Sequence, residues 1–194
     1  MILSLLKGID FHHADILTIE GAAAIVFYFT LYSFIGWLLE NSYSYFTTHI
    51  FFKENFLFGP FKPIYGFAPI LLVYLIVPKM NGTLIILFCF TIPTLVEYIS
   101  GAMLQKLFQK QWWDYSDMPI QLHGHICLPF SICWGLLSFI CLVWIHPVIT
   151  LIYSSIELYW GWIWAAVGLY FLADLVLAIR KHTLKDTIIE ETGA

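Results

Sequence analysis

Long apolar stretches separated by short polar segments run through the whole chain. They predict membrane-spanning helices, because about 20 consecutive apolar residues are needed to cross ~30 Å of hydrocarbon as a helix. Residues 147–157 are apolar but too few to span, which is typical of an interfacial or partly re-entrant helix. The pattern predicts an all-α fold, a polytopic transmembrane helical bundle. Its five predicted spans are residues 22–45, 64–77, 83–108, 128–145 and 158–179.

The segment that leads into the second predicted span is rich in glycine and proline. It reads Phe58-Gly59-Pro60-Phe61-Lys62-Pro63-Ile64-Tyr65-Gly66, and its two prolines and two glycines forbid a regular helix. Lipid cannot satisfy the backbone groups that such a loop leaves unpaired, so the loop must pack inside protein or line a wet cavity. The alternatives are a re-entrant or cavity-lining loop and a plain cytoplasmic loop with a turn.

The composition also indicates a membrane protein. Hydrophobic residues make up 60% of the 194 residues and charged residues only 11%, with a mean hydropathy of +0.82. Soluble domains contain about 25% charged residues, so this chain has too little polar surface to cover a globule in water. We expect one integral membrane domain over residues 1–194, with segment 1–21 and tail 180–194 outside the bilayer. The net charge of −4 and the lack of a basic run favour membrane lipids, not nucleic acid, as partners.

The basic residues predict the orientation, because cytoplasmic loops carry an excess of lysine and arginine. With five spans, only Lys7 and Lys79 of the nine basic residues lie on one side. We therefore expect a multi-pass protein of the cell membrane with its N-terminus outside and its C-terminus in the cytoplasm. The residues expected on the cytoplasmic side are Lys53, Lys62, Lys106, Lys110, Arg180, Lys181 and Lys185.

Three acidic residues, Glu40, Glu97 and Asp174, lie inside predicted spans. Glu40 follows Gly36 by four residues and Glu97 precedes Gly101 by four, so each carboxylate shares a helix face with a small residue that lets another helix approach. Each acid costs about 2.5–3.5 kcal/mol at a helix centre unless it is paired, protonated or wetted. Glu40 at the boundary and Asp174 near a basic residue have local explanations. Glu97 lies deeper, and we expect it to be functional.

A polar segment with two further kinds of candidate chemistry follows the third predicted span. Trp113 and Tyr115 flank Asp114, and such rings together with one carboxylate can form a cage for a cation. His123 and His125 would point to the same side if the chain there is extended.

Two imidazoles with Glu97 or Asp114 would suit a divalent metal. One His-x-His without a third ligand at a defined spacing is a weak signal, however, and hydrogen bonds from these histidines to the loop backbone are the alternative. No metal or other cofactor is therefore assigned. Ser131 with either histidine is a further candidate, a nucleophile pair, but no Gly-x-Ser-x-Gly motif surrounds Ser131.

Several motifs in this order resemble a known family, the CmpB-type "putative ABC-transporter type IV" membrane proteins. The resemblance covers about residues 25–147 and implies a transporter. The chain has no Gly-x-x-x-x-Gly-Lys-Ser/Thr motif, so any ATPase would be a separate subunit. The motifs are Gly36-Trp37-Leu38-Leu39-Glu40, Phe58-Gly59-Pro60, Pro63-Ile64-Tyr65-Gly66, Glu97 with Gly101, Trp113-Asp114-Tyr115-Ser116, and Gly124-His125-Ile126-Cys127-Leu128 with Ser131 and Trp134-Gly135.

Three functions remain open. The first is a transporter or permease-like protein whose cytoplasm-facing polar cavity binds a cationic or amphipathic substrate, or carries a proton, on intramembrane carboxylates. The second is an intramembrane enzyme acting on a lipid or lipid-linked substrate, and the third a non-catalytic accessory subunit. A homo-oligomer or a partner membrane subunit is expected with the first. The candidate binding residues are Glu40, Tyr65, Glu97, Trp113, Asp114, Tyr115, His123, His125, Ser131 and Trp134.

Overall fold

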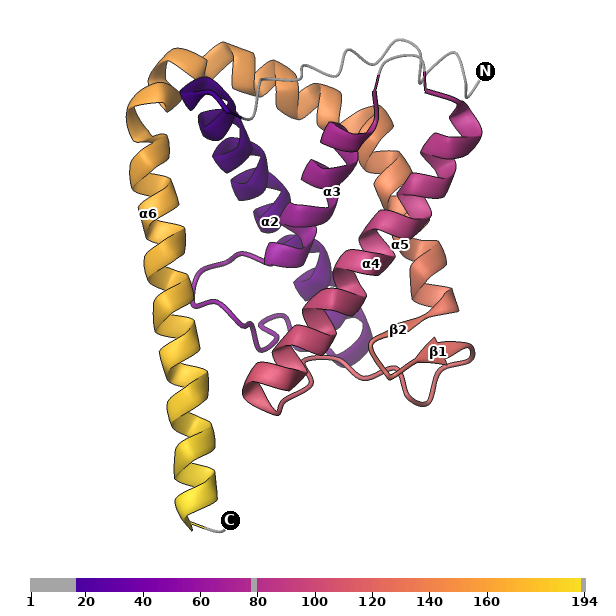
Figure 1. Cartoon of the computed structure of the whole chain (residues 1–194), viewed down its shortest axis with the longest axis vertical. Helices are drawn as coiled ribbons and strands as arrows, with labels where there is room; N and C mark the ends of the chain where they lie inside the picture. The colour runs from indigo at the N-terminus through magenta and orange to yellow at the C-terminus, as the bar shows by residue number, and fades with distance from the viewer. Residues whose placement is uncertain (1–16, 78–79, 193–194) are drawn as a thin grey trace.

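The computed structural model describes residues 17–77 and 80–192, with side chains up to residue 183. Most of the predicted extramembrane segment 1–21, and the end of the predicted tail 180–194, lie outside the described residues. The elements follow in the order α2 (Ile19–Thr48), α3 (Pro63–Leu75), α4 (Gly82–Phe108), β1 (Gln121–Leu122), β2 (Ile126–Cys127), α5 (Leu128–Ile140), the π-helix η1 (Cys141–Ile145) and α6 (His146–Thr192) (Figure 1).

The all-α prediction is confirmed, since the described strands are two residues each and form one small antiparallel hairpin. The helix ends have local causes. The Thr18 hydroxyl accepts a hydrogen bond from Gly21 N at the start of α2, and the Asn81 side chain accepts one from Thr83 N at the start of α4. The left-handed residues His49 and Gln109 end the same two helices.

Three helical runs of the described chain are long and apolar enough to cross a membrane, namely Ile19–Thr48, Gly82–Phe108 and Leu128–Thr183, while Pro63–Leu75 is shorter. The fourth and fifth predicted spans lie within the third run, in which α5, η1 and α6 follow one another without a gap. A straight helix of 56 residues would be roughly 84 Å long, far more than one bilayer crossing. Figure 1 shows that this run turns: it rises as α5, crosses one end of the molecule and returns as the long final part of α6.

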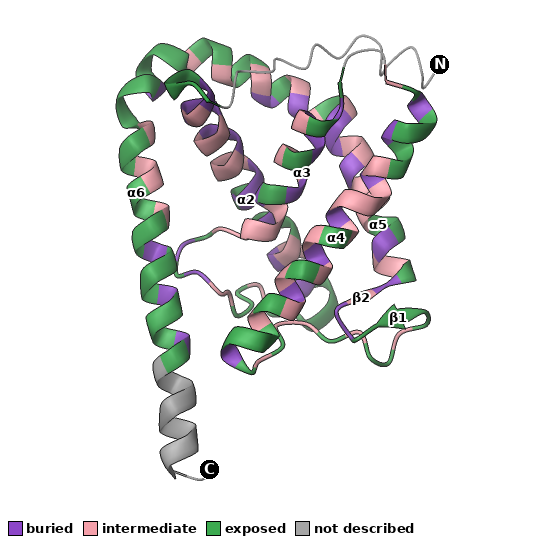
Figure 2. Cartoon of the chain, in the orientation of Figure 1, coloured by how far each residue is buried: buried purple, intermediate pink, exposed green. Residues whose placement is uncertain are grey.

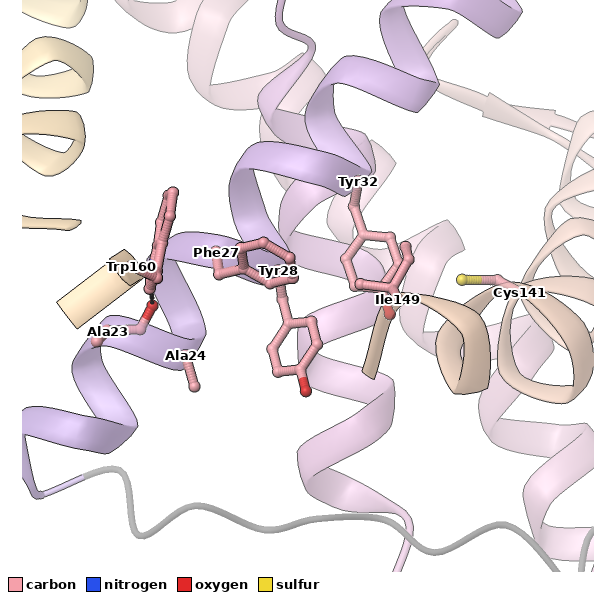
Figure 3. Packing of buried hydrophobic residues seen from close by; sticks show 8 residues of the cluster. All are labelled: Ala23, Ala24, Phe27, Tyr28, Tyr32, Cys141, Ile149 and Trp160. Carbon is pink, nitrogen blue, oxygen red and sulfur yellow. Dashed lines mark hydrogen bonds between the residues drawn. The ribbon is translucent and has the colours of Figure 1, made fainter. Parts of the chain in front are cut away.

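Two clusters of buried side chains hold the helices together. One lies between α2 and the first part of α6, where the Trp160 indole packs edge-on against Phe27 and donates a hydrogen bond to Ala23 O at 2.8 Å (Figure 3). Tyr32 and His146, both buried, share a hydrogen bond of 2.7 Å in the same region. The second cluster joins α3, α4 and η1 and consists of Leu72, Val73, Ile76, Ile85, Cys89 and Leu142.

Large apolar side chains also cover much of the outer surface. Figure 2 shows exposed residues along most of α6, and these include Leu169, Leu172 and Leu175. An exposed apolar surface of this extent is unfavourable in water and matches hydrocarbon. Together with the three long apolar runs it supports a location in the membrane.

A close approach between α2 and α3 depends on Gly36. A Cβ at this position would overlap the Tyr65 side chain, which lies against the Gly36 backbone. The lack of a side chain therefore fixes where Tyr65, near the start of α3, sits on α2.

We predict that Gly36→Ala destabilises the fold by about 1–3 kcal/mol, because the added methyl group forces Tyr65 out of its position. The measurement is thermal unfolding of the purified protein in a neutral detergent. Gly168→Ala is the matched control, since a Cβ there meets nothing within 4 Å. Equal unfolding temperatures for the two variants would contradict the proposed close packing.

Candidate functional site

Glu97 is a buried acid on the face of α4 that packs inside the protein. Its side chain is 3% exposed, and the same face carries Pro93 and Gly101 at helical spacing. The Tyr115 hydroxyl donates a hydrogen bond of 3.1 Å to Glu97 Oε1, and the Trp134 indole faces the same carboxyl. Glu97 Oε2 is buried without a hydrogen-bond partner. One oxygen of the carboxyl group is therefore satisfied and the other is not.

Aromatic side chains from three different segments surround this acid. Tyr65 of α3 and Trp134 of α5 pack with ring centroids 4.9 Å apart. Tyr65 also lies within electrostatic range of both Glu40 and Glu97. Tyr115 stacks on Phe130 at 4.8 Å while its hydroxyl reaches Glu97. We call Glu97, Tyr65, Tyr115 and Trp134 the Glu97 cluster.

A cleft opens beside the Glu97 cluster, between α2, α3, α5 and η1. The cleft is open on one side, its empty space of about 430 Å³ includes open solvent, and Tyr65 and Trp134 belong both to its wall and to the cluster. Glu40, Glu97 and Asp114 are not part of the wall. This cleft is therefore not the predicted cavity lined by carboxylates. The lining residues are Tyr32, Ile35, Gly36, Leu39, Tyr65, Ala68, Pro69, Trp134, Leu137, Ser138, Cys141 and Ile145.

Glu40 is paired with two lysines. Its Oε1 lies 2.9 Å from Lys62 Nζ and 3.2 Å from Lys53 Nζ, and the Lys62 side chain is only 13% exposed. Both lysines belong to the segment between α2 and α3, which folds back along α2. Glu40 is thus neutralised within the chain, and this local pairing agrees with its position near the boundary of the span.

The Gly-Pro-rich loop packs against α6 through Asp174, which is 4% exposed. Phe58 N and Gly59 N donate hydrogen bonds of 2.8 and 2.9 Å to the two oxygens of the Asp174 carboxylate. The Asn55 amide donates to the carbonyls of Gly59 and Phe61. These backbone groups of the loop are satisfied inside the protein, which a loop at membrane depth would require. Pairing with a basic residue was the local explanation for Asp174, but the carboxylate pairs with backbone amides.

Asp114 is exposed and forms a turn with Ser116, whose backbone N and hydroxyl both donate to Asp114 Oδ1. These hydrogen bonds lower the pKa of the Asp114 carboxyl. The flanking rings do not enclose it: Trp113 donates to His125 O at 2.9 Å, and Tyr115 is turned toward Glu97. The sequence pattern suggested a cation cage here, whereas the side chains point to different neighbours.

His123 and His125 are separated by a turn and not by extended backbone, because His123 and Gly124 both have positive φ, 54° and 70°. His123 is exposed and hydrogen-bonds the Tyr98 hydroxyl at 2.9 Å. His125 is buried against Gly101. The chain is therefore not extended there, yet both imidazole rings pack against Tyr98, with ring centroids 6.0 Å away for His123 and 5.7 Å away for His125.

A third metal ligand does not join these histidines, since the residues that the structure describes contain no group of three His, Cys, Asp or Glu side chains able to hold an ion. Ser131 is buried at the start of α5. Within the described ranges no hydrogen bond links Ser131 to His123 or His125, so a nucleophile pair is not assembled here.

Four residues that hold the site in place were not predicted from the sequence to belong to it. Lys62 and Lys53 pair with Glu40, Asn41 accepts a hydrogen bond from Lys53 N at 2.9 Å, and Asn55 pins the loop backbone. An asparagine inside or beside an apolar span is a usable signal, because a buried amide must find partners. Its partner, however, cannot be read from the sequence.

Comparison with protein families gives one match: the model of the family described as "Putative ABC-transporter type IV" (ABC_trans_CmpB) aligns with residues 27–179. The match extends past residue 147, where the resemblance seen in the motifs ends, and includes the part of α6 that carries Asp174. No curated protein and no solved structure matches the chain.

We predict that Asp174→Ala loosens the Gly-Pro-rich loop, because it leaves Phe58 N and Gly59 N without acceptors at a cost of about 1–3 kcal/mol each. Hydrogen–deuterium exchange of the protein in detergent, read by mass spectrometry, should then show faster exchange in peptides covering 54–62. Asp117→Ala, at an exposed position, is the control. Unchanged exchange in the Asp174 variant would show that other contacts hold the loop.

Proposed function

The chain belongs to the "putative ABC-transporter type IV" family, and from this membership and the site geometry we propose that it is a permease-like membrane protein. In this proposal Glu97 binds a cationic group or a proton on the transport path. Glu40 and Asp174 hold the structure around it. The cytoplasm-facing side is the one that carries the lysine pairs of Glu40.

One observation carries the proposal: Glu97 is 3% exposed, and its Oε2 has no hydrogen-bond partner. A buried carboxyl oxygen without a partner costs about 1–3 kcal/mol or more. A cation or a proton at Oε2 removes that cost, since either supplies the missing interaction. Glu97 is therefore built to accept positive charge.

Transport is favoured over catalysis by what surrounds this acid. An acid–base pair of Glu97 with His123 or His125 is not formed among the described residues, where the hydroxyl of Tyr115 donates to Glu97 instead. His125 lies against Gly101, one turn away on α4, and His123 is engaged by Tyr98. An enzyme acting on lipid-linked substrates, or an accessory subunit whose acids pair with a partner, remain the second and third proposals.

The membrane arrangement that fits this function has five crossings, with the N-terminus outside and the C-terminus in the cytoplasm. The turn of the run Leu128–Thr183 supports two crossings by α5 with η1 and by the later part of α6. A pathway of this size is completed by a second copy or a partner membrane subunit. Because the chain carries no nucleotide-binding motif, ATP would act through a separate subunit.

We predict that Glu97→Gln lowers uptake of tetramethylammonium into proteoliposomes at least about tenfold, because the amide removes the charge that attracts the cation. Uptake is driven by an imposed membrane potential and corrected for empty liposomes. Glu157→Gln, the same exchange at an exposed glutamate of α6, is the matched control. Equal uptake by the parental protein and Glu97→Gln would rule out Glu97 as the binding carboxylate.

A further inference from the structure

The cleft beside the Glu97 cluster is elongated. Its wall on α2 extends from Tyr32 to Leu39, roughly 10 Å along the helix, and its opposite wall on α5 and η1 extends from Trp134 to Ile145, roughly 16 Å. The two walls run in opposite chain directions (Figure 1), so Leu39 and Trp134 belong to one end and Tyr32 and Ile145 to the other. The space between them follows the helices and does not form a round pocket.

The two ends differ in chemistry. The end at Trp134 and Tyr65 adjoins the carboxyl of Glu97, and two aromatic faces 4.9 Å apart lie beside that acid. The other end runs along η1, where Cys141 and Ile145 line the wall. π-Helical turns inside α-helices are frequent at functional sites. The cleft therefore combines an anionic, aromatic end with an apolar remainder.

We propose that this cleft takes an amphipathic cation, with the positively charged group against Tyr65 and Trp134, beside the Glu97 carboxyl, and a linear hydrocarbon chain along α2 and η1. This inference rests on the proposed function and names its substrate class. Aromatic faces beside a carboxylate favour ammonium groups through cation–π attraction. An elongated apolar wall favours a hydrocarbon chain, and each buried methylene contributes about 0.8 kcal/mol.

Other occupants fit the same walls less well. An anionic amphiphile would place like charge against Glu97, and a neutral lipid would leave Glu97 Oε2 unsatisfied. A small cation without a chain would leave the apolar cleft unfilled. Lys53 and Lys62 do not offer an anion site in its place, because both are held by Glu40.

The orientation of the cleft also matches an amphiphile of the inner leaflet. Its charged end lies on the same side of the molecule as the Glu40–lysine pairs, because Gly36 and Leu39 immediately precede Glu40 on α2. Its apolar end points toward the start of α2 and thus toward the middle of the bilayer. A molecule in the cytoplasmic leaflet has its polar group and its chain in that same order.

The test is equilibrium binding of dodecyltrimethylammonium to the full chain in nanodiscs of zwitterionic lipid, with binding to empty nanodiscs subtracted. Tetramethylammonium and dodecyl sulfate are the comparison probes. The first keeps the cation without the hydrocarbon chain, and the second keeps the chain without the cation. We expect dodecyltrimethylammonium to bind at least about tenfold more tightly than either. Glu97→Gln should remove this preference for the cationic amphiphile.

A matched pair of variants tests the apolar part. Leu39 lines the cleft and is 43% exposed, whereas its neighbour Leu38 is 38% exposed and does not line it. Leu39→Trp should weaken dodecyltrimethylammonium binding about tenfold by filling the space, and Leu38→Trp should leave it unchanged. If Leu39→Trp fails to fold, Ser138→Leu fills the cleft from α5.

The outcomes separate this inference from the proposed function. If Glu97→Gln weakens both cations equally and Leu39→Trp has no effect, the carboxylate binds cations but the cleft does not hold the chain, and the inference fails alone. If dodecyl sulfate binds the parental protein as tightly as dodecyltrimethylammonium, charge is not recognised and the inference is also overturned. If Glu97→Gln changes none of the affinities, both the inference and the carboxylate site of the proposed function are wrong.

Discussion

Buried backbone groups outside regular helices need hydrogen-bond partners, and the segment between α2 and α3 finds them in distant parts of the chain. Asp174 supplies two of them by accepting from Phe58 N and Gly59 N, although it lies more than a hundred residues away. Lys62 N adds a third bond, to Ser33 O on α2. These contacts tie α6 and α2 to one loop, and the positions of the neighbouring side chains follow from it.

The three acids of the predicted spans have different partners around this loop. Lys62 is carried to Glu40 and pairs with it, Asp174 is occupied by the loop backbone, and Tyr65 is placed against Gly36. Glu97 accepts a hydrogen bond from the hydroxyl of Tyr115 on one oxygen, while its other oxygen is buried without one. A paired carboxylate in a membrane stabilises structure, while one with an open oxygen remains available to a cation or a proton. The difference in partners, rather than in depth, distinguishes the acids.

The sequence predicted what depends on local pattern and missed what depends on distant partners. Helix α4 was expected at residues 83–108 and begins one residue earlier. The apolar length of the segment is enough to locate this span. The expectation that Glu97 is functional followed from its depth in that span and stays a prediction. The partner of Asp174 was not predicted, since no local rule links an acid of α6 to amides at 58 and 59. Asp114 was misjudged because a flanking Trp and Tyr say nothing about which way their rings turn.

The polar segment after α4 positions Tyr115 against Glu97. Asp114 makes a turn with Ser116, the positive φ of Gly124 lets that turn pack closely, and Tyr115 N donates to Gly124 O at 2.9 Å. These bonds hold Tyr115 so that its hydroxyl reaches one oxygen of Glu97. The other oxygen of Glu97 is buried without a hydrogen-bond partner. The exposed turn and the buried acid are thus parts of one arrangement, in which the turn fixes the hydroxyl group that Glu97 accepts from.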